Sequence, residues 1–276
     1  MTKEMLVVIA FFVYILIRSV FIEPSSLEVK KYVIEDIQLQ GIKVAFLSDF
    51  HLKRRDYKRL DKIVKLTNSQ KPNIVILGGD FAVGRNIDKT MDPEIMASKL
   101  SLLNAQKYAV LGEHDWWSDG KKISAALRRN GIRVLENSSA RISTRGRYID
   151  IVGIADLTTQ KANIGQAYRR SGTPRIAITH NPDIYYDIVE KTNLILAGHT
   201  HGGQFVIPFT KPIFVSSRYG SKLASGLVKE TRNKMIVSKG LGVTGIPFRL
   251  NCKPEITIVE FVRSAPAKQK KSKYFY

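Results

Sequence analysis

The sequence contains little cysteine, which excludes some kinds of covalent and metal site, and few acidic residues, which indicates the charge of its partners. Its 276 residues include one cysteine, Cys252, so the chain has no internal disulfide and no thiolate cluster for zinc. Asp and Glu number 24 against 44 Lys and Arg, which gives a formal net charge of +20. This excess indicates an anionic partner, either nucleic acid or a membrane surface with acidic lipids. The 44% hydrophobic and 25% charged residues are typical of a folded protein and not of a disordered one.

A long apolar run begins the chain. Residues 5–17 are all apolar, and Arg18 and Ser19 separate them from a further apolar stretch at 20–22. Eighteen helical residues span about 27 Å, close to the roughly 30 Å hydrocarbon core of a bilayer. A cleaved signal peptide and a buried core helix are the alternatives. No small-x-small cleavage site follows the run, so we predict an uncleaved membrane anchor over residues 1–22.

The rest of the chain alternates between strand-like and helical patterns. Residues 23–40 are predicted to form a connector and an edge strand, with the strand over 29–39. From 41 to 263, short apolar runs alternate with amphipathic segments, which predicts an α/β domain. Asp92 before Pro93 is a typical helix start. Another helix is predicted from four residues at helical spacing: Leu60, Ile63, Val64 and Thr67.

The charged residues near the two ends of the chain bear on the membrane. Lys3 precedes the apolar run, whereas Arg18, Lys30 and Lys31 follow it, a weak bias toward a cytoplasmic domain. Residues 264–276 form a basic tail with an aromatic end. A solvated, disordered tail and a second membrane contact both remain open for this segment.

Five apolar strands end directly in polar groups that can bind metal. They are AFLSDFH, VILGGD, AVLGEHD, AITH and LILAGHTH, and together they contain all five histidines of the chain. Ligand sites in α/β sheets gather at the carboxyl ends of strands, so the five ends can converge. One histidine at a strand end is more often a structural residue than a ligand, but five of five favour a shared site. Mixed Asp and His donors suit Mn, Fe or Zn and disfavour calcium.

These segments resemble the signature of the calcineurin-like metallophosphoesterase superfamily, which is D-x-H, G-D, G-N-H-D/E, a lone H and G-H-x-H. In this chain the corresponding blocks are Asp49-Phe50-His51, Gly79-Asp80, Gly112-Glu113-His114-Asp115, His180 and Gly198-His199-Thr200-His201. The resemblance spans about residues 42–262 and is strongest to the membrane-associated bacterial branch, which includes the UDP-2,3-diacylglucosamine pyrophosphatase type. It implies two mixed β-sheets packed as a sandwich and flanked by helices.

The resemblance also implies a role for each matching residue. Asp49, His51 and His201 correspond to ligands of a first metal, His180 and His199 to ligands of a second, and Asp80 to the aspartate that bridges both. His114 corresponds to the residue that steadies the scissile phosphate and protonates the leaving group, and Asp115 to the carboxylate that orients it. The implied cofactors are two divalent or trivalent ions (Mn, Fe or Zn) that activate a water molecule for attack on phosphorus.

Glu113 departs from the family pattern, which has asparagine at this position. Glutamate is one methylene longer and adds a negative charge where an anionic substrate has to dock. It can still ligate the second metal, because carboxylates suit all of the expected ions. Alternatively it misfits and weakens the second metal site, which leaves a protein that is impaired or does not catalyse.

Several residues outside these blocks are candidates for binding the substrate. Arg218 and Arg249 can hold an anionic group, as can Lys211 and Lys222, although a solvated basic surface explains any one of them equally well. Trp116, with its neighbour Trp117, directly follows the metal-binding block and can line an apolar mouth of the site or simply pack in the core.

Three functions are therefore open. The first is a single-pass, inner-membrane hydrolase of a phosphodiester or pyrophosphate bond, with a lipid-linked, phosphate-containing substrate such as UDP-2,3-diacylglucosamine and a cytoplasmic catalytic domain. The second is a binding protein of the same fold that does not catalyse, because of Glu113. The third is a nuclease, which fits the charge but not the anchor, so we expect no nucleic-acid partner.

Overall fold

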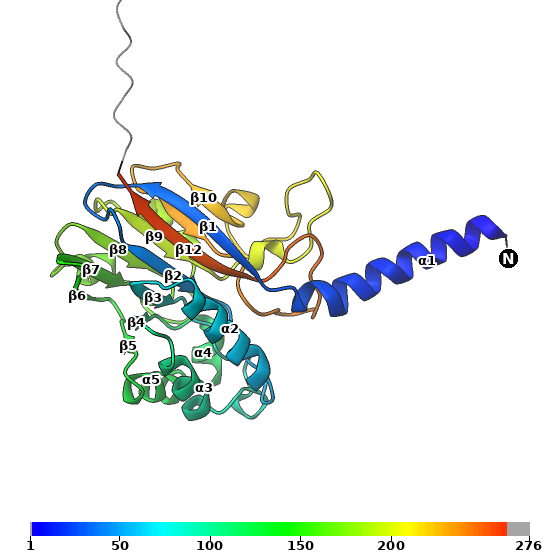
Figure 1. The fold of residues 1–276 in the computed structure, drawn as a ribbon, viewed down its shortest axis with the longest axis horizontal. Coiled ribbons are helices and arrows are strands. Elements are labelled where there is room, and N and C mark those ends of the chain that lie inside the picture. Colours follow the sequence, from blue (N-terminus) through cyan, green and yellow to red (C-terminus); the bar gives the residue numbers. More distant parts are fainter. Residues whose placement is uncertain (1, 264–276) are drawn as a thin grey trace, which may run out of the picture.

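The computed structural model describes residues 2–263. It shows two β-sheets packed face to face, with helices on one side and a long N-terminal helix that points away from the domain (Figure 1). The α/β sandwich predicted from the sequence is confirmed. The predicted basic tail at 264–276, with its possible membrane contact, lies outside the described residues.

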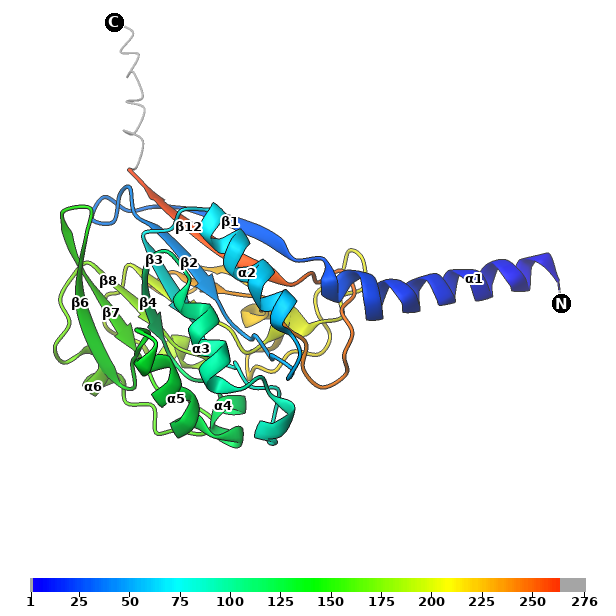
Figure 2. The same cartoon turned by 60° about the horizontal axis from the view of Figure 1, so that its bottom comes forward.

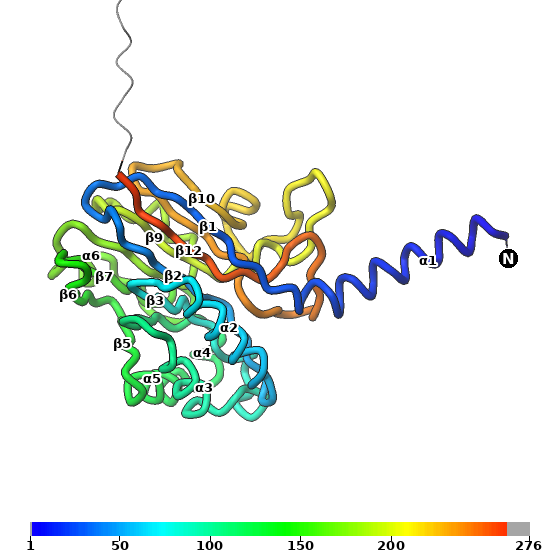
Figure 3. Tube along the Cα trace, in the orientation of Figure 1, coloured from blue at the N-terminus to red at the C-terminus, as the bar shows by residue number. Residues whose placement is uncertain are grey.

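The first sheet is mixed and, within the described residues, has six strands. β12 runs antiparallel to β2, whereas all other neighbours in this sheet pair in parallel. The first and last strands of the domain thus lie side by side, as the blue and red segments of Figure 3 show. In sheet order the strands are β1 (Glu28–Glu35), β12 (Glu255–Val262), β2 (Lys43–Leu47), β3 (Ile74–Leu77), β4 (Gln106–Ala109) and β5 (Arg133–Val134).

The second sheet is also mixed and has six strands in the described part of the chain. Its four central strands are parallel, and the strand at each edge is antiparallel to its neighbour. In sheet order the strands are β10 (Gly226–Val228), β11 (Met235–Val237), β9 (Leu194–Ala197), β8 (Arg175–Ile178), β7 (Arg147–Gly153) and β6 (Ser138–Thr144).

Side chains point alternately to the two faces of each strand, so each sheet contributes to a hydrophobic core on both of its sides. In β2, Phe46 faces the second sheet, whereas Leu47 faces the helices. In β9, Leu196 faces the first sheet and Ile195 packs into a third cluster on the outer side. Because successive side chains of a strand point to opposite faces, apolar runs without polar interruption are what a strand buried on both faces requires.

Three helices cover the outer face of the first sheet (Figure 2). They are α2 (Tyr57–Ser69), α3 (Pro93–Ser101) and α5 (Gly120–Arg129), and two short helices, α4 (Glu113–Ser118) and α6 (Ile164–Tyr168), lie in loops. The four residues at helical spacing in α2 are its buried residues, as predicted. The Asp92 carboxylate caps α3 by accepting hydrogen bonds from the N–H groups of Glu94 and Ile95.

The edge strand β1 ends earlier in the structure than the sequence predicted. β1 ends at Glu35, whereas the sequence predicted a strand to 39. The Asp36 carboxylate accepts hydrogen bonds from the N–H groups of Gln38 and Leu39, and this local turn competes with the extended backbone.

The N-terminal helix α1 (Lys3–Ile17) is exposed along its length. A π-helical turn (Arg18–Ile22) and a 3-10 turn (Glu23–Ser25) extend it. The whole stretch of 23 residues is long and apolar enough to cross a membrane, and 6% of its most apolar window is buried. Figures 1 and 2 show it projecting from the domain as a separate arm.

The base of this arm is fixed to the domain by polar contacts. The N–H of Arg249 donates to the carbonyl of Ser19, and the buried Glu23 carboxylate accepts from the N–H of Cys252. The Arg18 guanidinium donates to the Asn251 side chain. The arm therefore starts from a defined position beside the loop that carries Arg249.

Gly79 allows the turns after β3 and β4 to approach each other, and its replacement is a test of that approach. Its φ is +90°, and an added Cβ would lie 2.5 Å from the backbone nitrogen of Gly112. We expect Gly79→Ala to lower the free energy of unfolding by about 1–2 kcal/mol for the positive φ and by a further 1–3 kcal/mol, roughly, for the overlap.

Gly131→Ala is the matched control. Gly131 has a φ of +75°, but nothing lies within 4 Å of an added Cβ. Chemical denaturation of both variants should show a larger loss for Gly79→Ala. Equal losses would mean that the two turns do not meet as described.

Candidate metal centre

Five turns, each following a parallel strand, bring the predicted ligands to one edge of the sandwich. The turns follow β2, β3 and β4 of the first sheet and β8 and β9 of the second. Non-glycine residues with positive φ are uncommon and store strain, which persists where the surrounding structure enforces it. Five of the predicted ligands have this conformation: Asp49 (φ 55°), His51 (42°), Asp80 (53°), His199 (72°) and His201 (52°).

One group of ligand atoms gathers around His51 and His201. Their Nε2 atoms are 3.0 Å apart. The Asp49 Oδ1 atom lies 3.5 Å from His201 Nε2, and the Asp80 Oδ2 atom lies 3.6 Å from His51 Nε2. All four side chains are buried, so their donor atoms point at one another and not at water.

A second group gathers around Glu113. Its Oε2 atom lies 2.9 Å from His180 Nε2, and its Oε1 atom lies 2.7 Å from His199 Nδ1. Asp80 belongs to both groups, because its Oδ2 atom is also 3.5 Å from His180 Nε2. The residue that departs from the family pattern thus contacts both histidines of this group.

The protonation of these groups follows from burial and from their neighbours. Burial lowers the pKa of His51 well below its ordinary value. Burial also opposes a charge on His180, but the carboxylates of Asp80 and Glu113 outweigh it and raise the pKa of His180 well above normal. Burial raises the pKa of Asp80 to about 8. Burial and the attraction between His180 and the carboxylates therefore compete in setting the charge of the cluster.

The donor set fits metal cations. Among the buried side-chain atoms that make no hydrogen bond in the described part of the chain are four that belong to the two ligand groups: Asp49 Oδ2, Glu113 Oε2, His180 Nε2 and His199 Nδ1. The Nδ1–H of His51 donates to the carbonyl of Ala82 and that of His180 to the carbonyl of Gly78, which turns both Nε2 atoms toward the cluster. Cations at this position would replace the protons and satisfy the unpaired atoms.

His114 lies beside the first group, but Asp115 does not orient it. The His114 Nδ1–H donates to the carbonyl of Val83, and its ring packs edge-on to His51 at 4.7 Å. The Asp115 carboxylate accepts from the backbone N–H groups of Asp80, Ala82 and Gly112 at 2.9–3.0 Å. Asp115 is at the start of α4 and turns back to the helix N-terminus, so it holds the backbone around Asp80. The role predicted for it is corrected to positioning the turn after β3.

Arg249 is placed differently from the prediction that it binds substrate. It is fully buried, and its guanidinium donates to the carbonyls of Lys239, Gly242 and Cys252. Its Nη2 atom lies 3.2 Å from His201 Nδ1. Burial, His51 and Arg249 together hold the pKa of His201 well below its ordinary value, so the imidazole stays neutral. Arg249 therefore contacts His201 on the Nδ1 side of its ring, away from the Nε2 atom that faces the other ligands.

The other predicted substrate-binding residues lie outside the two ligand groups. Arg218 is exposed and faces the Asp183 carboxylate at 3.5 Å. Trp116 packs against the core between the first sheet and its helices. The Trp117 ring lies 5.0 Å from the His114 ring, and the Arg85 guanidinium lies over it, 5.0 Å from its centroid. Trp117 is three residues after His114 on α4, and helical spacing could have identified it.

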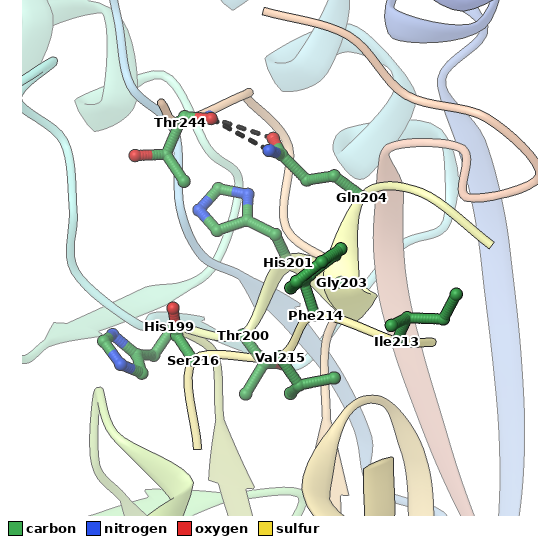
Figure 4. Close-up of a pocket in the computed structure, with 10 residues that line it drawn as sticks. All are labelled: His199, Thr200, His201, Gly203, Gln204, Ile213, Phe214, Val215, Ser216 and Thr244. Atoms are coloured by element: carbon green, nitrogen blue, oxygen red, sulfur yellow. Dashed lines mark hydrogen bonds between the residues drawn. The ribbon is translucent and has the colours of Figure 1, made fainter. Parts of the chain in front are cut away.

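A pocket of about 400 Å³ opens beside the histidines of the turn after β9. His199 and His201 line it together with Gln204, Phe214 and Thr244 (Figure 4). The Thr244 hydroxyl is also 3.5 Å from His114 Nε2. Gln204 and Thr244 were missed in the sequence, because no spacing relates them to the ligand blocks.

Comparison with known proteins agrees with this geometry. Residues 42–203 match the family model described as calcineurin-like phosphoesterase. The chain belongs to this family. It is 31% identical over 230 residues to "Phosphodiesterase YaeI" of Escherichia coli (80% of this chain, 82% of that protein), and 30% identical over 229 residues to "Uncharacterized metallophosphoesterase YkoQ" of Bacillus subtilis (78% and 82%). The chain is thus a metal-dependent phosphoesterase.

A vertebrate relative is also similar to this phosphoesterase. It is the "Transmembrane protein with metallophosphoesterase domain" of Danio rerio, 27% identical over 237 residues, which cover 79% of this chain and 53% of that protein.

Replacing Arg249 tests its structural role in the phosphoesterase. We expect Arg249→Gln to lower the free energy of unfolding by at least about 2 kcal/mol, because buried carbonyls lose a charged donor. For a domain of this size that is a fall in Tm of roughly 5 °C or more. Arg218→Gln is the control, since this exposed arginine should change Tm little. If Arg249→Gln is as stable as Arg218→Gln, the buried contacts of Arg249 are not what holds the loop.

Proposed function

We propose that the protein is a membrane-anchored, two-metal phosphoesterase that hydrolyses a phosphodiester or pyrophosphate bond. The main support is the position of Asp80 between the two ligand groups. Its Oδ2 atom lies 3.6 Å from His51 Nε2 in the first group and 3.5 Å from His180 Nε2 in the second. Asp49, His51, His201 and Asp80 would hold one cation, and Glu113, His180, His199 and Asp80 would hold the other. The mixed carboxylate and imidazole donors suit Mn, Fe or Zn.

The protein residues orient the reaction. When bound, the two cations neutralise phosphate oxygens and acidify a water molecule for attack on phosphorus. His114 donates Nδ1–H to the carbonyl of Val83, so Nε2 is the ring atom that takes up a proton from solvent. In this cationic form Nε2–H can bind a phosphate oxygen and pass the proton to the leaving group, and burial, which lowers the pKa of His114, favours that release. Because the nucleophile is water, no serine or cysteine nucleophile is required.

Glu113 acts as a ligand of the second cation. Its carboxylate oxygens lie within 3 Å of both histidines of that group, which supports a ligand geometry and not a misfit. A carboxylate adds negative charge that the family asparagine lacks, so the second cation should be a weaker Lewis acid here. The competing proposal is a binding protein that does not catalyse, and it also rests on Glu113. The Glu113 variants described below distinguish the two proposals.

The proposed substrate is lipid-linked, such as UDP-2,3-diacylglucosamine, and nucleic acid is not expected. An exposed apolar α1 and a net charge of +20 support an anchor at an anionic membrane surface. Within a bacterium the proposed location is the inner membrane, with the catalytic domain in the cytoplasm as the charges around α1 favour.

Glu113 variants test the two-metal reaction. With Mn²⁺ present, the wild type and Glu113→Asn should both cleave bis(p-nitrophenyl) phosphate, because the amide oxygen can replace the carboxylate. Glu113→Ala should lose at least about 100-fold in kcat/KM, as expected when a cation loses a ligand. Glu94→Ala, at an exposed glutamate of α3, is the control. If neither the wild type nor Glu113→Asn cleaves the ester, the binding protein is favoured.

A pair of sugar nucleotides tests the substrate class. The detergent-solubilised protein should hydrolyse the pyrophosphate bond of UDP-2,3-diacylglucosamine at least about tenfold faster than that of UDP-N-acetylglucosamine, which lacks the acyl chains. A tenfold ratio corresponds to about 1.4 kcal/mol of recognition of the lipid part. Equal rates would show that the acyl chains are not recognised.

A further inference from the structure

Two loops beside the base of α1 expose large apolar side chains. They comprise residues 205–216 and 244–250, and we call them the apolar loops. Five of their side chains are strongly exposed: Phe209 (108%), Phe214 (78%), Ile246 (66%), Ile213 (60%) and Ile207 (41%). Scattered exposed apolar residues are ordinary, but a cluster of them marks a surface that contacts something apolar.

The apolar loops form one surface. The Gln204 side chain donates to the carbonyl of Thr244 at 2.8 Å and accepts from its N–H at 2.9 Å (Figure 4). The rings of Phe205 and Phe248 meet edge-on at 5.9 Å. The N–H of Val206 donates to the carbonyl of Leu250. These contacts hold the two loops against each other.

This surface adjoins the base of α1. The Asn251 side chain accepts from the Arg18 guanidinium at 3.0 Å and donates to the carbonyl of Val206 at 2.8 Å. One amide group thus joins the last part of the helical arm to the start of the first apolar loop. In Figures 1 and 2 the loops (yellow and orange) lie at the same end of the domain as the base of α1.

The apolar loops also border the pocket of the metal centre. Phe214 and Ile213 line the pocket that His199 and His201 line from the other side (Figure 4). The first loop folds back on the turn after β9, where an added Cβ on Gly203 would lie 2.7 Å from the Phe214 carbonyl. The loop therefore lies directly against the turn that carries His199 and His201.

We propose that the apolar loops insert into the same bilayer face that α1 enters, so that the pocket opens at the depth of the lipid headgroups. The proposal rests on the membrane anchor of the proposed function. If α1 crosses the bilayer, a surface joined to its base lies at the interface. Apolar side chains are buried there and the exposed Lys211 meets lipid phosphates. Because the apolar loops are joined to the base of α1, we expect a bilayer, and not a second copy of the chain, to cover them.

The consequence concerns how the substrate arrives. A phosphate in a lipid headgroup would reach the metal centre by lateral diffusion, with its acyl chains still in the bilayer. The exposed Phe209 and Ile246 then have no role in the chemistry itself, so they can be replaced without touching the ligands.

Site-specific fluorescent labels test the insertion. The full-length protein is reconstituted into phosphatidylcholine–phosphatidylglycerol vesicles, with single cysteines introduced as Phe209→Cys, Ile246→Cys, Val13→Cys or Tyr148→Cys. The native Cys252 is 1% exposed and should not be labelled in the folded protein. Tyr148, 70% exposed on β7, is the control in water, and Val13 reports the anchor. We expect lipids with brominated acyl chains to quench the labels at 209, 246 and 13, and aqueous iodide to quench the label at 148.

The other outcomes overturn the proposal in distinguishable ways. If iodide quenches the labels at 209 and 246 while brominated lipids quench the label at 13, the anchor stands and the loop insertion fails. If the label at 13 also stays in water, the anchor fails and the loop proposal fails with it. If neither quencher reaches 209 and 246, a protein surface covers the loops instead of lipid.

Discussion

The structure of the site depends on buried charges of like sign that cations are needed to hold together. Asp49, Asp80 and Glu113 are each less than one-tenth exposed and point at one another across four histidines. Protons can neutralise part of this charge, as the raised pKa of Asp80 and His180 indicates. Metal cations would satisfy these donor atoms at once and would offset the strain of five ligand residues with positive φ at the ends of the strands.

The loop that carries Arg249 contacts both this site and the N-terminal helical arm. The buried guanidinium lies against His201, while the backbone N–H of the same residue donates to Ser19 at the base of α1. Asn251, two residues later, contacts Arg18. The base of α1, the metal-binding residues and the apolar loops therefore occupy one end of the domain. In a phosphoesterase that acts on a lipid-linked substrate, such an arrangement brings the reacting phosphate to the metals without removing the lipid from the bilayer.

The sequence was enough to predict that these residues lie together, because each follows an apolar strand and strand ends converge by the geometry of the sheet. The sandwich was predicted from the family resemblance. It was not enough for contacts between distant segments. The Arg249 guanidinium lies against His201, 48 residues earlier in the chain, and two partners of Asp115 lie 33 and 35 residues earlier, in the turn after β3. Nor does composition distinguish an exposed Phe209 from a core phenylalanine. Of the two tryptophans named from the sequence, Trp117 lies beside the His114 ring and Trp116 packs against the core, as the helical spacing from His114 indicates.

The most direct test of the central claim is anomalous diffraction from crystals of the full-length protein grown with Mn²⁺. The account predicts two anomalous peaks about 3.5–4 Å apart, the usual spacing of a two-metal site. One peak should contact Asp49, His51, Asp80 and His201, and the other Asp80, Glu113, His180 and His199. A single peak in the first group, with the Glu113 carboxylate turned away from His180 and His199, would contradict it.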